Sequence, residues 1–134
     1  MANLKDIEGI GATYAEKLGK AGPTSTEALL DVGATAKGRA DLAASTGISE
    51  KLILRWVNMA DLFRIKGVAE QYSDLLEAAG VDTVAELAQR KAENLQAKMA
   101  EVNEAKKLVH RVPTLSEVTG WVEQAKNLPR AVSY

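Results

Sequence analysis

The sequence contains no cysteine and a single histidine among its 134 residues, and these absences exclude several kinds of chemistry. Without cysteine the chain has no disulfide framework, no thiolate metal ligand and no thiol nucleophile. His110 alone provides no histidine-rich metal centre, and an isolated surface histidine is far commoner than a catalytic one. No pair of carboxylates stands out for acid–base work. We therefore expect a protein that is not an enzyme, with no catalytic residues, no metal site and no cofactor.

A surplus of charge of one sign is also missing. The chain has 17 Lys and Arg residues against 18 Asp and Glu residues, so its net charge is −1. A chain this close to neutral is not drawn to nucleic acid or to an anionic membrane by its overall field. Any site for a polyanion therefore has to be local.

Long apolar runs are absent as well. No segment approaches the roughly 18 consecutive apolar residues of a membrane-spanning helix. The N-terminal residues lack the apolar stretch behind basic residues that marks a secretory signal. The Gly9-x-Gly11 pair lacks the third glycine and the preceding strand of a dinucleotide site. The sequence predicts a cytoplasmic location, no membrane partner and no small-molecule substrate.

The residues that are present favour helices. Hydrophobic residues make up 46% of the chain and charged residues 26%, which is typical of a folded globular protein. Aromatic residues are scarce at 4%, and only three prolines interrupt the chain. Ala and Leu, both strong helix formers, fill most of the apolar positions. We predict an all-α fold.

An internal repeat is the most informative feature. The segment that begins at Ile7 recurs 58 positions later, at Ile65, with seven identities over 24 aligned positions, where random matching would give roughly one or two. The identical pairs are Ile7/Ile65, Gly9/Gly67, Tyr14/Tyr72, Leu18/Leu76, Ala21/Ala79, Gly22/Gly80 and Leu29/Leu87. An apolar stripe around Trp56 aligns with one around Trp121. The repeat predicts two similar multi-helix halves, residues 1–64 and 65–128, packed on each other and followed by a short frayed tail over residues 129–134.

Local signals place the helices. An amphipathic stretch follows each turn and ends at Gly22 or Gly80, which are typical C-terminal caps. A hydroxyl residue with a carboxylate three positions later predicts capping boxes at residues 24–27, 83–86 and 114–117. Further helices are predicted over residues 35–45 and 92–102 and from Ser49 onward. Trp56 and Trp121 lie on apolar stripes, which favours core packing over stacking on a base or anchoring a partner.

Residues 4–18 resemble the helix-hairpin-helix motif, in which a Gly-apolar-Gly turn joins two helices. The residues that carry the resemblance are Leu4, Ile7, Gly9, Ile10, Gly11, Tyr14, Ala15 and Leu18. Residues 62–76 keep the frame but have Ala69 in place of the second glycine and Ser73 in place of Ala15. Over residues 4 to about 128 the chain resembles a bacterial tandem helix-hairpin-helix family catalogued as domain of unknown function 4332. The resemblance implies that a helix-hairpin-helix motif opens each half, and it is uninformative about function.

The chemistry of such a turn points to an anion site. Glycines two residues apart permit positive φ angles and leave N–H groups pointing outward at the start of a helix, where the helix dipole also attracts anions. A nucleic-acid phosphate fits this concavity, and phosphate contacts position a protein without reading sequence. The candidate residues are Gly9, Ile10, Gly11, Ala12, Thr13 and Lys17 in the first turn and, more weakly, Lys66, Gly67, Val68 and Ala69 in the second. We expect the first turn to be the better site because Ala69 disfavours the positive φ that Gly11 permits.

Two interpretations of the turns remain open. Acidic residues, Glu8 and Glu16 among them, offset the lysines near the first turn, and phosphate affinity normally needs several uncompensated cations. In one interpretation, the turns serve only to set helix packing, and the chain is a protein-interaction or scaffolding domain with no role in nucleic-acid binding. The alternative is a non-enzymatic module that contacts nucleic-acid phosphates weakly and without sequence preference.

Overall fold

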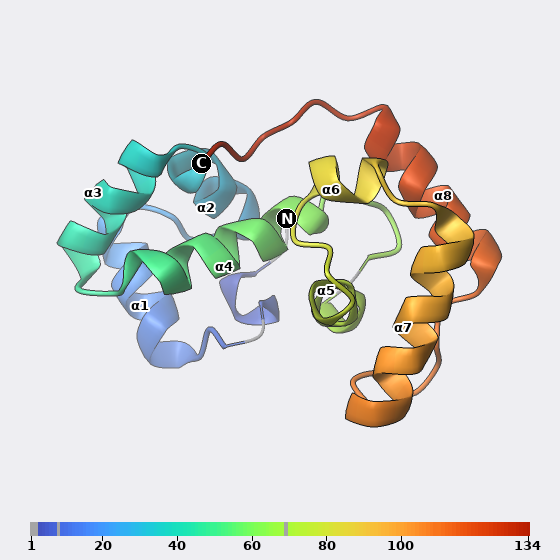
Figure 1. Ribbon diagram of the computed structural model, residues 1–134. Helices are drawn as coiled ribbons and strands as arrows, with labels where there is room; N and C mark the ends of the chain where they lie inside the picture. The colour runs from blue at the N-terminus through green and yellow to red at the C-terminus, as the bar shows by residue number, and fades with distance from the viewer. Residues whose placement is uncertain (1–2, 8, 69) are drawn as a thin grey trace. The chain divides into compact units, whose positions relative to one another are not determined.

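The computed structural model describes residues 3–7, 9–68 and 70–134 (Figure 1). These residues form a short 3-10 helix and eight α-helices, and their only extended pairing is an isolated bridge between Asn3 and Ser25. The all-α prediction is confirmed. None of the described helices has both the length and the apolar character needed to cross a membrane. The helices are η1 (Leu4–Asp6), α1 (Ala12–Ala21), α2 (Thr26–Gly33), α3 (Ala36–Thr46), α4 (Glu50–Leu62), α5 (Glu70–Ala78), α6 (Val84–Ala88), α7 (Ala92–Lys106) and α8 (Leu115–Lys126).

The chain divides into two compact units. Unit 1 consists of Met1–Asp61 together with Ala131–Tyr134, and unit 2 consists of Leu62–Arg130. The division falls after Asp61, one residue before the end of α4, whereas the sequence analysis placed the boundary after residue 64. Within unit 1, α3 packs against both α1 and α2, and within unit 2, α8 packs against α6 and α7.

The last four residues are an ordered part of unit 1. The N–H of Ser133 donates to the carbonyl oxygen of Ala34 at 2.8 Å, and the side chain of Val132 is buried. The guanidinium of Arg39, itself buried, donates to the carbonyl oxygens of Ser133 at 2.7 Å and of Gly33 at 2.8 Å. The prediction of a frayed tail is therefore wrong for residues 131–134, because a buried cation far away in the sequence binds their backbone.

A tryptophan lies in the core of each unit. Trp56 on α4 is fully buried, and the ring of Tyr14 packs on it with 5.1 Å between ring centroids. Trp121 on α8 is 3% exposed, and the ring of Tyr72 packs on it at 5.3 Å. The core packing predicted for both tryptophans is confirmed. The apolar stripes that carry them therefore serve the fold rather than an exposed stacking platform.

The cap predictions are only partly correct. Thr114 and Glu117 form the complete predicted box at the start of α8. Thr83 caps α6, but the carboxylate of Glu86 accepts from Asp82 rather than from Thr83. The predicted box at residues 24–27 is wrong, because α2 begins one residue later and Ser25 is its N-cap.

Glycines end the two helices that follow the turns, as predicted. Gly22 caps α1 with a φ of +133°, and Gly80 follows α5 with a φ of +97°. The helix predicted over residues 92–102 continues as α7 to Lys106, and Lys107 then ends it in the left-handed conformation.

Candidate functional site

The first turn connects η1 to α1 and exposes most of the predicted site. Gly9 adopts a φ of +94°, a conformation that glycine enters at little cost. The side chain of Ile10 is buried, and its N–H donates to the carbonyl oxygen of Ile7 at 3.1 Å. Gly11 is exposed and forms the N-cap of α1. The turn is thus anchored by one apolar side chain between two exposed glycines.

The role predicted for Gly11 is wrong in one respect. Its φ is −90° and its ψ is −173°, an extended conformation open to any residue, and a β-carbon there would meet nothing within 4 Å. The reason is its position as the N-cap, where extended backbone is normal. The expected inequality of the turns therefore cannot come from the φ angle of Gly11. Ala69, the corresponding residue of the second turn, lies outside the described residues.

The start of α1 offers backbone donors to solvent. Gly11 has no side chain to cap the helix, and the first bond along α1 runs from the N–H of Ala15 to the carbonyl oxygen of Gly11 at 2.9 Å. The N–H groups of Ala12 and Thr13 have no acceptor among the described residues, and both residues are exposed. These are the orphan groups at which a helix attracts anions.

Lysine side chains near this turn differ in their pairing. Lys17, one turn along α1 from Thr13, is exposed and forms no ion pair within the described part of the chain. Lys20 on the same helix binds Glu16 at 3.1 Å, although both side chains are largely exposed. Lys17 is thus the cation of α1 that is available to an anion at the turn.

Two side chains of α4 reach the first turn, and sequence analysis did not assign them to it. An ideal β-carbon on Gly9 would lie 3.4 Å from Nε1 of Trp56 and 3.5 Å from Nη1 of Arg55. Arg55 therefore adds a guanidinium to the turn from a residue far away in the sequence. One sequence signal could have pointed to Arg55. It stands directly before Trp56, whereas the aligned residue before Trp121 is Gly120, so the two repeats differ in charge at this position.

The second turn also begins with a glycine, but a side chain of α8 is hydrogen-bonded to its backbone. Gly67 also has a φ of +94°, and an ideal β-carbon on it would lie 2.9 Å from Nε1 of Trp121. The amide of Gln124 accepts from the N–H of Lys66 at 2.8 Å and donates to its carbonyl oxygen at 3.2 Å. Val68 is buried. The backbone at Lys66 is therefore occupied, whereas in unit 1 the aligned position of Gln124 holds the buried Met59.

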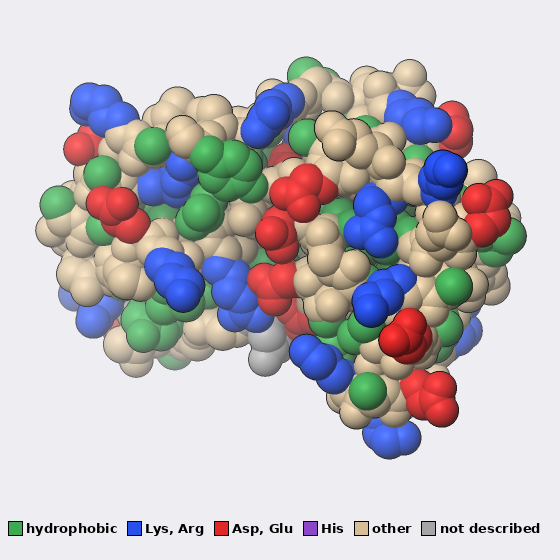
Figure 2. Space-filling model, in the orientation of Figure 1, with side chains coloured by type: hydrophobic (Ala, Val, Ile, Leu, Met, Phe, Trp, Pro, Cys, Tyr) green, Lys and Arg blue, Asp and Glu red, His purple; other side chains and the backbone are tan. Residues whose placement is uncertain are grey.

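The surface charges are mixed in both units. Unit 1 has seven Lys or Arg residues against eight Asp or Glu, and unit 2 has ten of each. Figure 2 shows basic and acidic side chains interspersed over the visible face rather than gathered in one basic field. In the part of the chain with described positions, no group of three or more His, Asp or Glu side chains is arranged to hold a metal ion. Any anion site must therefore rest on a few local donors.

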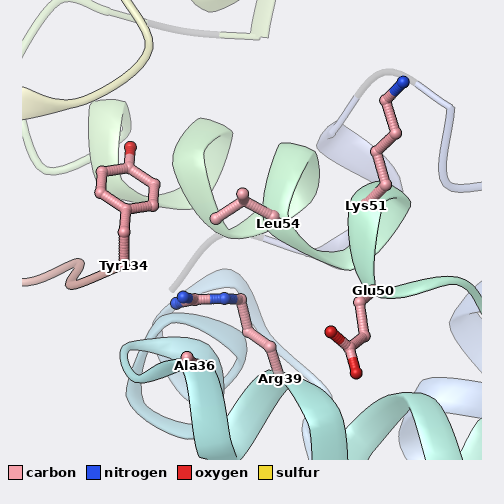
Figure 3. A pocket seen from close by; sticks show the side chains of 6 residues that line it. All are labelled: Ala36, Arg39, Glu50, Lys51, Leu54 and Tyr134. Carbon is pink, nitrogen blue, oxygen red and sulfur yellow. The ribbon is translucent and has the colours of Figure 1, made fainter.

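Unit 1 also has a shallow hollow of about 360 Å³ beside its C-terminal residues (Figure 3). Arg39 of α3 reaches toward Tyr134, with 6.0 Å between the guanidinium carbon and the ring centroid. Tyr134 is 61% exposed. The residues that line the hollow are Ala36, Arg39, Glu50, Lys51, Leu54 and Tyr134. Its mixture of an exposed ring, aliphatic side chains and charges is of a kind that contacts other proteins.

Comparison with known proteins gives one match. The model of a family described as a domain of unknown function (DUF4332) matches residues 8–128. The chain belongs to this family. No curated protein and no solved structure matches it. The DUF4332 match includes both glycine turns and both tryptophans, whereas Tyr134, which borders the hollow, lies outside it.

Proposed function

We propose that this DUF4332 protein is a non-enzymatic binding module whose two turns are helix-hairpin-helix motifs, and that its first turn contacts nucleic-acid phosphates weakly and without sequence preference. The observation that carries the proposal is the exposed start of α1, where the N–H groups of Ala12 and Thr13 have no acceptor among the described residues. A phosphate placed there gains hydrogen bonds and the favourable end of the helix dipole.

The mixed charge of unit 1 limits the strength of this contact. Lys17 and Arg55 are the two cations that the proposal assigns to the contact, so it neutralises one or two phosphates. Each neutralised phosphate contributes a slope of about −0.9 to the dependence of log affinity on log salt. Raising the salt from about 50 to about 200 mM then weakens binding by about 3- to 12-fold, a shallow response for a nucleic-acid-binding protein.

The proposal assigns different tasks to the two turns. Gln124 already binds the backbone of Lys66, and Gly120 replaces the arginine that unit 1 places beside Gly9. The backbone of Lys66 is therefore already bonded, and the second turn lacks a guanidinium in the place of Arg55. Its task in this proposal is to hold α5 against Trp121.

Titration of a fluorescent duplex and of a fluorescent single strand at about 50 and about 200 mM salt tests the proposal. We expect weak binding that is equal for scrambled sequences, and a several-fold loss for Lys17→Gln. Lys20→Gln is the matched control, because it removes the same charge from the same helix at a lysine already paired with Glu16. Absence of binding at about 50 mM salt, or equal losses for the two variants, would overturn the proposal.

A protein-interaction domain is the second candidate, and the hollow beside Tyr134 favours it. An aromatic side chain that is 61% exposed beside Leu54 and Ala36 is suited to burial against a partner. This candidate predicts no nucleic-acid binding at low salt. It also predicts that Tyr134→Ser abolishes partner capture while Lys17→Gln leaves it unchanged.

A further inference from the structure

The space that the missing side chain of Gly9 leaves is bordered by two nitrogen donors. Nε1 of Trp56 lies 3.4 Å and Nη1 of Arg55 lies 3.5 Å from the point that a β-carbon would occupy. Both residues belong to α4, on which they are neighbours, and Gly9 itself is exposed. Two N–H-bearing nitrogen atoms of α4 therefore lie beside an exposed glycine of the turn.

The indole N–H of Trp56 has no acceptor. Trp56 is fully buried, and Nε1 is one of the few buried side-chain nitrogen or oxygen atoms without a hydrogen-bond partner in the described structure. Buried donors of this kind are rare in native proteins, and each calls for an explanation such as an unseen water molecule or ion. A ligand oxygen bound beside Gly9 would explain the unpaired indole N–H.

We propose that Trp56 and Arg55 complete an anion site at the first turn, in which the guanidinium and the indole N–H bind oxygen atoms of one phosphate group. The inference rests on the proposed function and adds two side-chain donors to the backbone N–H groups of Ala12 and Thr13. Guanidinium groups suit phosphate because their donors match its oxygens in pairs. Since Nε1 has almost no exposed surface, the proposal requires side chains around Nε1 to move before the indole N–H meets an anion.

Unit 2 is a built-in comparison for this site. Trp121 lies against Gly67 as Trp56 lies against Gly9, but the residue before Trp121 is Gly120, which has no guanidinium in the place of Arg55. Trp121 therefore reports what phosphate does to an indole beside such a turn when the arginine is missing.

The experiment records the two indole N–H signals of the ¹⁵N-labelled full chain by NMR. Trp121→Phe assigns them, so the assignment does not depend on a variant of Trp56. Inorganic phosphate is added against sodium chloride of equal ionic strength, and a duplex is added in a separate arm at about 50 mM salt. We expect phosphate and duplex to shift the signal of Trp56 and to leave that of Trp121 in place.

The charge variants complete the test. We expect Arg55→Gln to weaken phosphate and duplex binding by about 3- to 10-fold, Arg55→Lys to weaken it less, and Lys20→Gln to leave it unchanged. Thermal unfolding of each variant separates a loss of binding from a loss of folded protein.

The outcomes distinguish this inference from the proposed function. If the duplex binds but the Trp56 signal stays in place and Arg55→Gln binds equally well, the inference is overturned and the proposed function survives. If phosphate shifts the indole N–H signal of Trp56 but no duplex or single strand binds, the site binds free phosphate and the nucleic-acid function is overturned. If neither ligand binds, both are overturned.

Discussion

The indole of Trp121 lies so close to Gly67 that a β-carbon on this glycine would stand 2.9 Å from Nε1. Real β-carbons almost never approach another atom that closely, and the φ of +94° at Gly67 is strained for any residue with a side chain. Two independent constraints thus require glycine at this position. The first glycine of the turn is a packing requirement of unit 2, whatever the turn binds.

Gly67→Ala should lower the free energy of unfolding by about 1–3 kcal/mol, through backbone strain and displacement of the indole. Gly120→Ala is the matched control on α8, where a β-carbon would meet nothing within 4 Å. Because alanine favours helix over glycine, this control should raise stability by about 0.5–1 kcal/mol. Urea unfolding measures both, and equal stabilities would contradict the packing role.

Gln124→Met, which copies the residue found at Met59 in unit 1, should loosen the second turn. The variant removes two hydrogen bonds to the backbone of Lys66 and should cost about 1 kcal/mol. Hydrogen exchange at the N–H of Lys66 should accelerate, whereas Glu123→Gln, on the same helix, should leave it unchanged. Unaltered exchange in Gln124→Met would show that the amide does not hold the turn.

Arg39→Met should destabilise unit 1 by about 2–4 kcal/mol, because the buried guanidinium binds the carbonyl oxygens of Gly33, Ala34 and Ser133. Exchange at the N–H of Ser133 should accelerate at the same time, since the C-terminal residues lose their anchor. Lys37→Met, on the exposed face of α3, should change stability by less than about 0.5 kcal/mol. A mild effect of Arg39→Met would mean that the C-terminal residues are held mainly by Val132.

Lowering the pH should reduce the free energy of unfolding of unit 2, because Glu117 becomes protonated. The Arg111 guanidinium, bonded to both carboxylate oxygens at 2.7 and 3.0 Å, lowers the pKa of Glu117 from 4.5 to about 2. A lowered folded-state pKa gives stability that is complete above pH 4.5 and is lost as the pH falls toward 2. Burial raises the pKa of Asp82, so that carboxyl acts in the opposite sense. Glu117→Gln should therefore flatten the fall in stability between pH 4.5 and 2, and an unchanged slope would contradict this account.

The sequence predicted those features that depend on local pattern. Apolar spacing and glycine caps located the helices and the burial of Trp56 and Trp121, because helix periodicity and backbone conformation are local properties. The approach of Arg55 to the first turn and the hydrogen bond of Arg39 to Ser133 bring together residues far apart in the sequence and depend on how the helices pack. The extended conformation of Gly11 was missed because a glycine pattern does not reveal which glycine carries the positive φ.

Glu8 gives a further test of the electrostatic argument, from its place in the sequence directly before Gly9. Removing a negative charge next to an anion site should strengthen phosphate binding, so Glu8→Gln should tighten duplex binding by about 2- to 5-fold at about 50 mM salt. The gain should disappear at high salt, where such interactions are screened. Weaker duplex binding by Glu8→Gln would contradict an anion site at this turn.

The most direct test of the central claim follows the backbone amide signals of the ¹⁵N-labelled protein by NMR while a duplex is added at about 50 mM salt. The account predicts that the signals of Ala12 and Thr13 shift, since their N–H groups bind the phosphate, and that those of Lys66 and Gly67 stay in place. Shifts confined to Lys66 and Gly67, or no shifts at all, would contradict it.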